Sequence, residues 1–380
     1  MKILVTGAKG FLGRNLCATL KNIAEGKDRS FGIDSDLEVY EYDIDSDPSL
    51  LGKWCKDCEF VFHLAGVNRP KDTAEFMQGN CGFTSTLLAE LEWHRNSCPI
   101  MISSSVQAEL DNPYGKSKLA GEELLRRHAE RLGAKILIYR FTNLFGKWCR
   151  PNYNSVIATF CNNIANGLPI KVNDPNAQFR FAYVDDVVAE LIAALQGKEH
   201  RSGDFCYVPV EYTATVGQIA DMIYGFKASR TELSVPDMSD AFTAKLYATY
   251  LSYLPEKEFS YPLKVNQDAR GSFTEIIRTP DRGQFSVNIS KPGITKGNHW
   301  HHTKNEKFLV VSGKAVIRFR RIDSDEVISY YVSGEKPEVV DIPTGYTHNI
   351  ENLGDTDLVT FMWASECFDP QKPDTYYLEV

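Results

Sequence analysis

Residues 2–13 read KILVTGAKGFLG and are followed by a helical pattern, RNLCATLKNIAE. The short apolar run at 2–5 is typical of a strand buried in a parallel sheet. Glycines at Gly7, Gly10 and Gly13 allow a tight turn, a close approach of backbone to a pyrophosphate, and tight packing of helix against strand. The N-terminus of the helix then faces the phosphate charge. This stretch therefore predicts a dinucleotide-binding α/β fold.

Residues after the next two predicted strands are further candidates for contact with the dinucleotide. The strand at 37–42 ends at Asp43, whose carboxylate would bind the ribose hydroxyls of NAD and repel a 2′-phosphate. Lys9 and Arg14 border the glycine turn and could balance such a phosphate, so the residues leave NADH and NADPH both open. The strand at 59–64 runs into Ala65 and Gly66. The candidate cofactor-binding residues are Gly7, Lys9, Gly10, Phe11, Leu12, Gly13, Asp43, Leu64, Ala65, Gly66, Tyr114 and Lys118.

Residues suited to carbonyl chemistry follow the predicted strand at 99–103. Tyr114 and Lys118 are four residues apart and share one face of a predicted helix. We expect the Lys118 ammonium to lower the pKa of the Tyr114 phenol, which makes the phenol a proton donor and acceptor near neutral pH. A serine hydroxyl at the strand end can hold the carbonyl oxygen that is reduced. Ser105 is the first candidate and Ser104 the second, because the short gap before Tyr114 leaves open which serine points inward.

About 250 N-terminal residues resemble the extended short-chain dehydrogenase/reductase (SDR) family, in the branch that acts on nucleotide sugars. Beside the glycine turn, the resemblance lies in YGKSK at 114–118, YRFTNLFG at 139–146 and YVDDV at 183–187. It implies a Rossmann-like doubly wound parallel sheet and a reductase that uses NAD(P)H. The implied catalytic residues are Ser105, Tyr114 and Lys118, and the implied substrate residues are Ser104, Asn143 and Arg180.

A second group of chemically active residues lies in GITKGNHWHHTKNEKFLVVSG at 293–313. Side chains at i and i+2 of a strand share a face, so His299 and His301 point the same way. Glu306 opens the next apolar run, and His348 lies in PTGYTHNIEN at 343–352. Three imidazoles and one carboxylate suit a divalent transition metal such as zinc. The ion would either polarise a carbonyl or brace the fold.

These two stretches resemble the two motifs of the cupin family, which implies an all-β barrel after the α/β domain. Short predicted strands with turn signals recur from Tyr261 onward, as expected of a barrel. The polar segment at 255–258, PEKE, is the predicted linker. The expected domains are therefore residues 1–254, the reductase, and residues 255–380, the cupin.

Length and composition are those of a globular protein with two separate cores. The chain has 380 residues, 43% of them hydrophobic and 24% charged. A net charge of −8 argues against nucleic acid or an acidic membrane surface as the main partner. No run approaches the roughly 20 apolar residues of a membrane span. Nine scattered cysteines and an N-terminus without a signal peptide predict a cytoplasmic protein with reduced thiols.

A reductase and a cupin on one chain suggest two steps on one keto sugar. A carbonyl at C4 makes the C3 hydrogen acidic, because the carbanion left on deprotonation is delocalised as an enolate. Removal of this proton and its return from the other face inverts C3. Hydride transfer to C4 then removes the carbonyl, so the inverted centre no longer exchanges. The cupin is therefore expected to act first. The residues single out no base for this step: His302 is a candidate by position, but strand alternation directs it away from the metal, and Lys304 and Tyr346 are named without a positional argument.

The whole chain resembles the CapF-type bifunctional enzymes of bacterial capsule and O-antigen synthesis, which serve the UDP-N-acetyl-L-fucosamine pathway. The resemblance rests on HLAGVNRP at 63–70, DNPYGKSKLAGE at 111–122 and the stretch at 297–313. It implies C3 epimerisation of a UDP-2-acetamido-2,6-dideoxy-4-hexulose and C4 reduction to UDP-2-acetamido-2,6-dideoxy-L-talose. It also implies NADPH, bound zinc and a homodimer.

Two other functions fit the same sequence. The first is a nucleotide-sugar 4-ketoreductase with one activity, whose cupin only dimerises or senses product. The second is a regulator that binds a nucleotide sugar without catalysis, although the intact Tyr114 and Lys118 pair argues against it.

Overall fold

The computed structural model describes residues 1–33, 35–70 and 72–380. They form two compact units, Met1–Tyr224 with Asp240–Pro255, and Gly225–Ser239 with Glu256–Val380. The segment Gly225–Ser239, which the sequence analysis assigned to the reductase domain, belongs to the second unit. The backbone amide of Arg278 donates a hydrogen bond to the carbonyl of Leu233 at 2.8 Å, which ties this segment to a strand of that unit.

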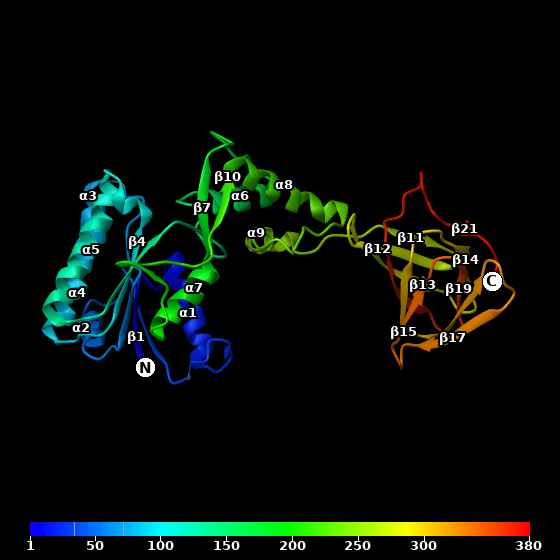
Figure 1. Cartoon of the computed structure of the whole chain (residues 1–380), viewed down its shortest axis with the longest axis horizontal. Coiled ribbons are helices and arrows are strands. Elements are labelled where there is room, and N and C mark those ends of the chain that lie inside the picture. Colours follow the sequence, from blue (N-terminus) through cyan, green and yellow to red (C-terminus); the bar gives the residue numbers. More distant parts are fainter. Residues whose placement is uncertain (34, 71) are drawn as a thin grey trace. The chain divides into compact units, whose positions relative to one another are not determined.

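The first unit is built on a seven-stranded sheet with helices on both faces (Figure 1). Neighbouring strands are parallel, except for the short antiparallel pair at one edge. The strands, in spatial order, are β2 (Glu38–Tyr42), β1 (Lys2–Thr6), β3 (Phe60–His63), β4 (Ile100–Ser105), β5 (Ile136–Phe141), β9 (Phe205–Cys206) and β8 (Arg201–Ser202). The strand order reverses between β1 and β3, which is where ligands bind in open α/β sheets. The predicted doubly wound fold is confirmed.

Two hydrophobic cores lie on the two faces of this sheet. Ile3 and Val5 of β1 pack into the core under α1 (Phe11–Ala24) and α7 (Val184–Leu195). Leu4 points the other way, into the second core. That second core lies under α2 (Ser49–Cys55), α4 (Phe83–Trp93) and α5 (Pro113–Leu132). Burial of both faces explains why β1 reads as a continuous apolar run.

A smaller three-stranded sheet completes the first unit, with β7 between β10 and β6. Its strands are β6 (Asn143–Phe145), β7 (Gln178–Tyr183) and β10 (Tyr212–Thr215).

The other helical segments of the described chain are α3 (Ala74–Phe76), a π-helical turn (Met77–Gly82), two short 3-10 turns (Val106–Glu109 and Glu256–Glu258), α6 (Val156–Ala165), α8 (Val216–Glu232) and α9 (Ala241–Leu251). None of the helices among the described residues is long and apolar enough to cross a membrane.

The second unit is a sandwich of two antiparallel sheets, as expected of a cupin-like β domain (Figure 1). One sheet has the order β11 (Val265–Asp268), β12 (Gly271–Thr279), β13 (Gly283–Ser290), β20 (Leu358–Ala364), β15 (Glu306–Ser312) and β18 (Val339–Ile342). The other has the order β17 (Val327–Ser333), β16 (Lys314–Arg321), β19 (Tyr346–Asn352), β14 (Thr295–Trp300) and β21 (Tyr376–Tyr377). Phe308 of one sheet and Ile317 and Ile350 of the other meet in the core.

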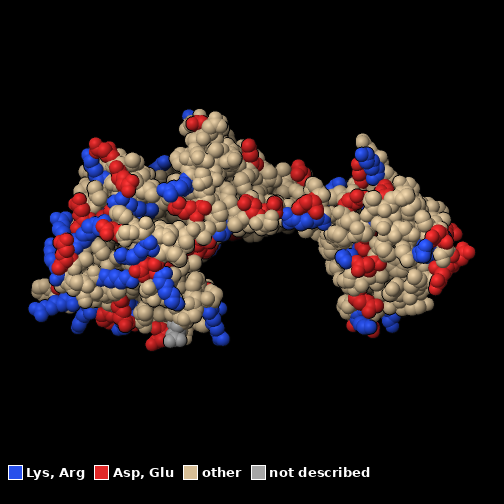
Figure 2. Space-filling model, in the orientation of Figure 1, with Lys and Arg blue, Asp and Glu red and all other residues tan. Residues whose placement is uncertain are grey.

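Acidic and basic side chains are interspersed on the visible face of each unit, without a broad basic surface (Figure 2). This pattern agrees with the net charge of −8.

Candidate functional site

The glycine turn after β1 lies directly against the segment after β3. Gly7 has φ 72°, and a Cβ on it would lie 2.6 Å from the amide nitrogen of Ala65. A Cβ on Gly13 would lie 2.1 Å from the carbonyl oxygen of Gly7, so α1 packs on the turn at a distance that only glycine allows. The turn and residues 64–66 therefore meet where the strand order reverses.

The N-terminus of α1 is free to receive an anion. The cap residue Gly10 offers no side-chain cap, and the first turn carries no acidic residue. The first backbone N–H groups of a helix have no partner within the helix, and they carry its positive dipole end. With the glycine cradle beside them, these donors fit the pyrophosphate of a dinucleotide.

Asp43 is held beside this turn by backbone donors. Its carboxylate accepts hydrogen bonds from the amides of Lys9 at 2.7 Å and Ile44 at 2.8 Å. The Lys9 ammonium pairs with Asp45, and this hydrogen bond raises the Lys9 pKa. Arg14 lies over the Trp148 ring, 5.1 Å from its centre. The positive charge of Lys9 is thus already paired.

The structure brings Ser105, Tyr114 and Lys118 together at the end of β4 and the start of α5. Asn112 caps α5, because its side-chain oxygen accepts a hydrogen bond from the amide of Gly115 at 2.8 Å. Tyr114 therefore lies in the first turn, where a hydrogen bond links it to Ser105. We call these three residues the Ser–Tyr–Lys group.

The electrostatics of this group differ from the expectation that Lys118 lowers the pKa of Tyr114. Burial raises the pKa of Tyr114, and the hydrogen bond with Ser105 acts in the opposite direction. The Lys118 ammonium lies 5.8 Å from the centre of the Tyr114 ring and donates to the carbonyl of Ser103 at 2.9 Å. Burial lowers the pKa of Lys118 to about 8. The ammonium is thus directed at the strand end rather than at the phenol.

Ser104 points away from Tyr114, into a buried charged cluster. Its hydroxyl bonds to the carboxylate of Glu122, which also accepts two hydrogen bonds from Arg140, at 2.9 and 2.7 Å. Successive strand residues face opposite sides, so β4 presents only one of the two serines to Tyr114. That serine is Ser105.

Asn80 connects the cofactor side of the sheet to α5. It is buried in the π-helical turn, where its amide group donates to Ser117 at 2.9 Å and to the carbonyl of Val67 at 3.1 Å. A Cβ on Gly66 would lie 3.0 Å from the Lys118 ammonium. Residues 64–66, predicted to contact the cofactor, therefore lie beside the predicted catalytic lysine.

The two predicted substrate residues Asn143 and Arg180 lie next to each other on paired strands β6 and β7. The amide group of Asn143 donates to the backbone carbonyl of Arg180 at 3.2 Å. The Arg180 guanidinium forms an exposed ion pair with Glu211 at 3.2 Å.

The second unit gathers the four predicted metal ligands into one cluster. One ligand atom from each of the four residues lies within 4.8 Å of the others. His299 and His348 are cross-strand neighbours on β14 and β19, and Glu306 begins β15. The nearest Glu306 oxygen lies 3.5 Å from Nε2 of His301 and 3.3 Å from Nε2 of His348. The metal cluster comprises His299, His301, Glu306 and His348.

The ligand atoms of the metal cluster are buried, and their protonation states suit a bound cation. Nε2 of His301, Nε2 of His348 and one Glu306 oxygen are buried without a hydrogen-bond partner. Although burial raises the pKa of Glu306, its contacts with His301 and His348 lower it to about 2. Burial lowers the pKa of His299 to about 4. A neutral imidazole and an ionised carboxylate are the forms that bind metal, so these residues fit zinc.

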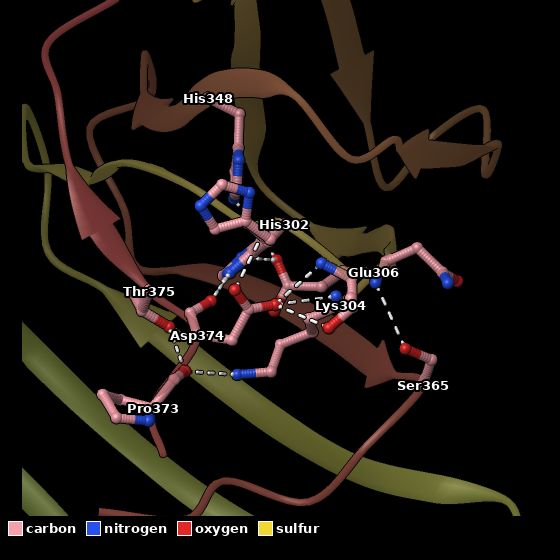
Figure 3. Close-up of polar contacts among 11 residues, drawn as sticks. His302, Lys304, Glu306, His348, Ser365, Pro373, Asp374 and Thr375 are labelled. Atoms are coloured by element: carbon pink, nitrogen blue, oxygen red, sulfur yellow. Dashed lines mark hydrogen bonds and ion pairs between the residues drawn. The ribbon is translucent and has the colours of Figure 1, made fainter.

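Asp374, which the sequence analysis missed, supports the cluster from the C-terminal segment (Figure 3). Its carboxylate accepts hydrogen bonds from three successive amides, those of residues 302–304, at 3.0, 2.9 and 2.9 Å. Its backbone carbonyl lies 2.5 Å from Nδ1 of His301, which leaves Nε2 of that ring facing Glu306. Asp374 also adopts φ 37°. No local pattern predicts this contact, because Asp374 lies far along the chain from His301.

A cavity of about 480 Å³ opens beside the cluster and includes His299 and His348 in its wall. The three residues considered as epimerase base, His302, Lys304 and Tyr346, are not among those that line it. His302 packs on Trp300 and on Tyr376, and the Lys304 ammonium donates to the carbonyl of Pro373 at 2.9 Å. These contacts direct His302 and Lys304 to the C-terminal segment instead.

Two protein families match this chain, one in its N-terminal part and one in its C-terminal part. Residues 3–205 match the NAD dependent epimerase/dehydratase family. Residues 266–376 match the polysaccharide biosynthesis C-terminal domain.

Whole-chain relatives have the same combination of domains. The chain is 42% identical over 380 residues to a UDP-2-acetamido-2,6-beta-L-arabino-hexul-4-ose reductase of Pseudomonas aeruginosa, covering 100% of this chain and 99% of the relative. A crystal structure of the capsular polysaccharide assembling protein CapF from Staphylococcus aureus superposes with a TM-score of 0.93 at 55% identity, covering 100% of both chains. A UDP-glucuronic acid 4-epimerase from Bacillus cereus superposes with a TM-score of 0.51 at 22% identity, over 67% of this chain and 99% of that one, which shows the shared fold alone.

Proposed function

Because the chain belongs to the NAD dependent epimerase/dehydratase family, and to its CapF type with the polysaccharide biosynthesis C-terminal domain, we propose that it catalyses two steps on one nucleotide sugar. The first is C3 epimerisation of a UDP-2-acetamido-2,6-dideoxy-4-hexulose in the second unit. The second is NAD(P)H-dependent reduction at C4 in the first unit, which gives UDP-2-acetamido-2,6-dideoxy-L-talose for capsule or O-antigen synthesis.

The observation that supports the reduction is the Ser–Tyr–Lys group beside Gly66. A bound dinucleotide supplies the hydride for C4. Ser105 holds the C4 oxygen by a hydrogen bond, and Tyr114 gives its proton to this oxygen as the alkoxide forms. The buried Lys118 ammonium holds the nicotinamide ribose, and its positive charge, 5.8 Å from the centre of the Tyr114 ring, stabilises the tyrosinate that remains without a direct hydrogen bond to it. Asn143 and Arg180 bind the sugar nucleotide.

The observation that supports the epimerisation is that a metal cluster and a cavity adjoin in the second unit. His299, His301, Glu306 and His348 hold zinc, which supplies a Lewis acid when bound. The name of the Pseudomonas aeruginosa relative supports the substrate class, because it specifies a 4-keto derivative of a 2-acetamido sugar carried on UDP.

The proposed dinucleotide is NADPH, with NADH as the alternative. Both carboxylate oxygens of Asp43 already accept backbone amides, which weakens the expected repulsion of a 2′-phosphate. The pairing of Lys9 with Asp45 works against NADPH, because it leaves less free positive charge for that phosphate. The ratio of kcat/KM for the two dinucleotides decides between them.

We also propose a homodimer. Strand β17 lies at the edge of its sheet and exposes Ile328, Tyr330 and Tyr331. An exposed apolar edge strand is a site where a second chain can pair. Sedimentation equilibrium tests this proposal. The cytoplasmic location, the absence of a nucleic-acid partner and the domain limits 1–254 and 255–380 stay predictions.

The experiment that tests the proposed function separates the two steps. The purified protein is incubated with the UDP-linked 4-keto sugar in deuterated water without a dinucleotide, and NADPH is then added. We expect deuterium at C3 in the first stage and reduction at C4 in the second. Reduction without C3 labelling would instead support a single-function ketoreductase. A protein that binds the sugar but gives neither product would support the regulator.

A further inference from the structure

A β-bulge places Lys296 in the wall of the cavity beside the metal cluster. In a regular strand, Lys296 and His299 would face opposite sides, because they are three residues apart. The register between β14 and β19 shifts between Gly297 and His299, and Asn298 in between has φ 59°. The extra residue of the bulge places the side chains of Lys296 and His299 on the same face of β14, and both residues line the cavity.

Hydrogen bonds hold the Lys296 ammonium in place. It donates to the side-chain oxygen of Asn288 at 2.8 Å and to the carbonyl of Ile289 at 2.7 Å. Asn288 is itself buried and also lines the cavity. An ammonium has three N–H donors, so one remains for a ligand. The half-buried ammonium is therefore oriented before any ligand arrives.

Lys296 differs from the other charged groups of the cavity. Asp268, the last residue of β11, and Arg270, in the turn that follows, form an exposed ion pair with each other at 2.7 Å. The described charged or imidazole side chains in the wall are otherwise His299 and His348, which belong to the metal cluster. Burial lowers the pKa of Lys296, Arg270 acts in the same direction, and Asp268 opposes them. Lys296 is thus a partly desolvated cation that forms no ion pair at contact distance with a carboxylate among the described residues of this wall.

We propose that the Lys296 ammonium binds the C4 oxygen of the keto sugar in this cavity and stabilises the enolate formed during C3 epimerisation. The inference rests on the proposed function. As the C3–H bond breaks, its electron pair forms the C3–C4 double bond, and the π pair of the carbonyl moves to the C4 oxygen. The proton passes to the solvent pool and is replaced from the opposite face. Lys296 donates its third N–H to the oxygen on which the negative charge develops.

The size of the effect follows from other sites that stabilise an oxyanion. Removal of one such donor lowers the rate roughly 100- to 1,000-fold. We therefore expect Lys296→Met to lower the rate of deuterium incorporation at C3 about 100-fold, measured in deuterated water without a dinucleotide. The bound zinc per chain stays unchanged, because Lys296 is not a ligand. The matched control is Lys307→Met, since Lys307 is an exposed strand residue that pairs with Asp341.

A second variant tests whether the charge itself matters. Lys296→Ala leaves space for a small amine, so added methylammonium is expected to restore part of the exchange rate. A merely structural lysine would show no such rescue. Normal exchange in Lys296→Met, loss of zinc together with exchange, or no rescue of Lys296→Ala would each overturn the inference. Absence of exchange in the unmodified protein would instead refute the proposed epimerase, so the two failures are distinguishable.

Discussion

The Ser–Tyr–Lys group comes from one junction between β4 and α5, whereas the metal cluster comes from three strands of the second unit and from His301, which follows β14. In the Ser–Tyr–Lys group, each polar side chain already has a partner: Lys118 donates to Ser103, and Ser105 bonds to Tyr114. In the second unit, buried atoms of His301, Glu306 and His348 have no hydrogen-bond partner. Unpaired buried polar atoms are costly, so we expect the metal cluster to depend on a cation in a way that the Ser–Tyr–Lys group does not.

From this difference we expect that each site can be damaged while the other remains intact. The first site depends on one helix start and on the burial of one ammonium. The second depends on strand register and on Asp374, which is remote in sequence.

Tyr114→Phe is expected to lower the rate of C4 reduction by about 1,000-fold, because it removes the proton donor to the C4 oxygen. Deuterium exchange at C3 should stay unchanged, since that step is assigned to the other unit. NADPH consumption and mass spectrometry of the product measure the two steps. Tyr224→Phe, at an exposed tyrosine, is the matched control. Unchanged reduction in Tyr114→Phe would remove the catalytic assignment.

Lys118 should make the stability of the protein depend on pH. Its pKa is lowered from 10.5 to about 8 in the folded chain. Between these values the unfolded chain binds the proton and the folded chain does not, so the free energy of unfolding rises with pH. The rise is on the order of 3 kcal/mol, since each pKa unit corresponds to about 1.4 kcal/mol. Denaturant titrations at pH 7 and 10 should show a larger rise in the free energy of unfolding for the unmodified protein than for Lys118→Met. The same rise in both proteins would contradict the prediction.

His348→Ala is expected to weaken zinc binding by at least about 100-fold, because loss of a direct ligand exceeds the roughly 10- to 100-fold effect of an outer partner. Exchange at C3 should fall with the bound metal, while reduction of an alternative ketone by the first unit should persist. Competition with a chromogenic chelator measures the affinity. The half-buried His94 of the first unit provides the control variant His94→Ala. Loss of both C3 exchange and ketone reduction in His348→Ala would show that the two sites are not independent.

Asp374→Asn is expected to weaken zinc binding about 10-fold, at the lower end of the range for residues that orient a ligand. The amide keeps the size of the side chain but loses the negative charge that accepts three backbone amides. The absorption spectrum of the cobalt-substituted protein should change, because the His301 ring is less firmly held. Asp369→Asn, in the same C-terminal segment, is the control. An unchanged affinity and spectrum would show that His301 is oriented without Asp374.

Much of the first unit could be read from the chain because its signals are local. A buried parallel strand is a run of apolar residues, and a phosphate-binding turn needs glycine where a Cβ would strike Ala65. The Tyr114 and Lys118 pair is set by helical periodicity. The metal cluster was also predictable, since strand alternation puts His299 and His301 on one side. Composition alone favoured two globular units.

Other properties were decided only by the tertiary structure. The choice of Ser105 over Ser104 depends on a buried Glu122, and the pKa of Tyr114 is raised by its burial and lowered by its hydrogen bond with Ser105. Segment Gly225–Ser239 joined the second unit through a contact with a distant strand.

Lys296 and Asp374 show why the rest could not be read from the sequence. A bulge in β14 puts the Lys296 side chain on the same face as His299, although strand alternation would put it on the opposite face. The His301 ring is held by the backbone carbonyl of Asp374, which is distant in sequence. Local patterns fix which residues can form a helix or a strand. Burial, register and long-range hydrogen bonds arise only when distant segments pack, and these decide which atoms meet and what charge they carry.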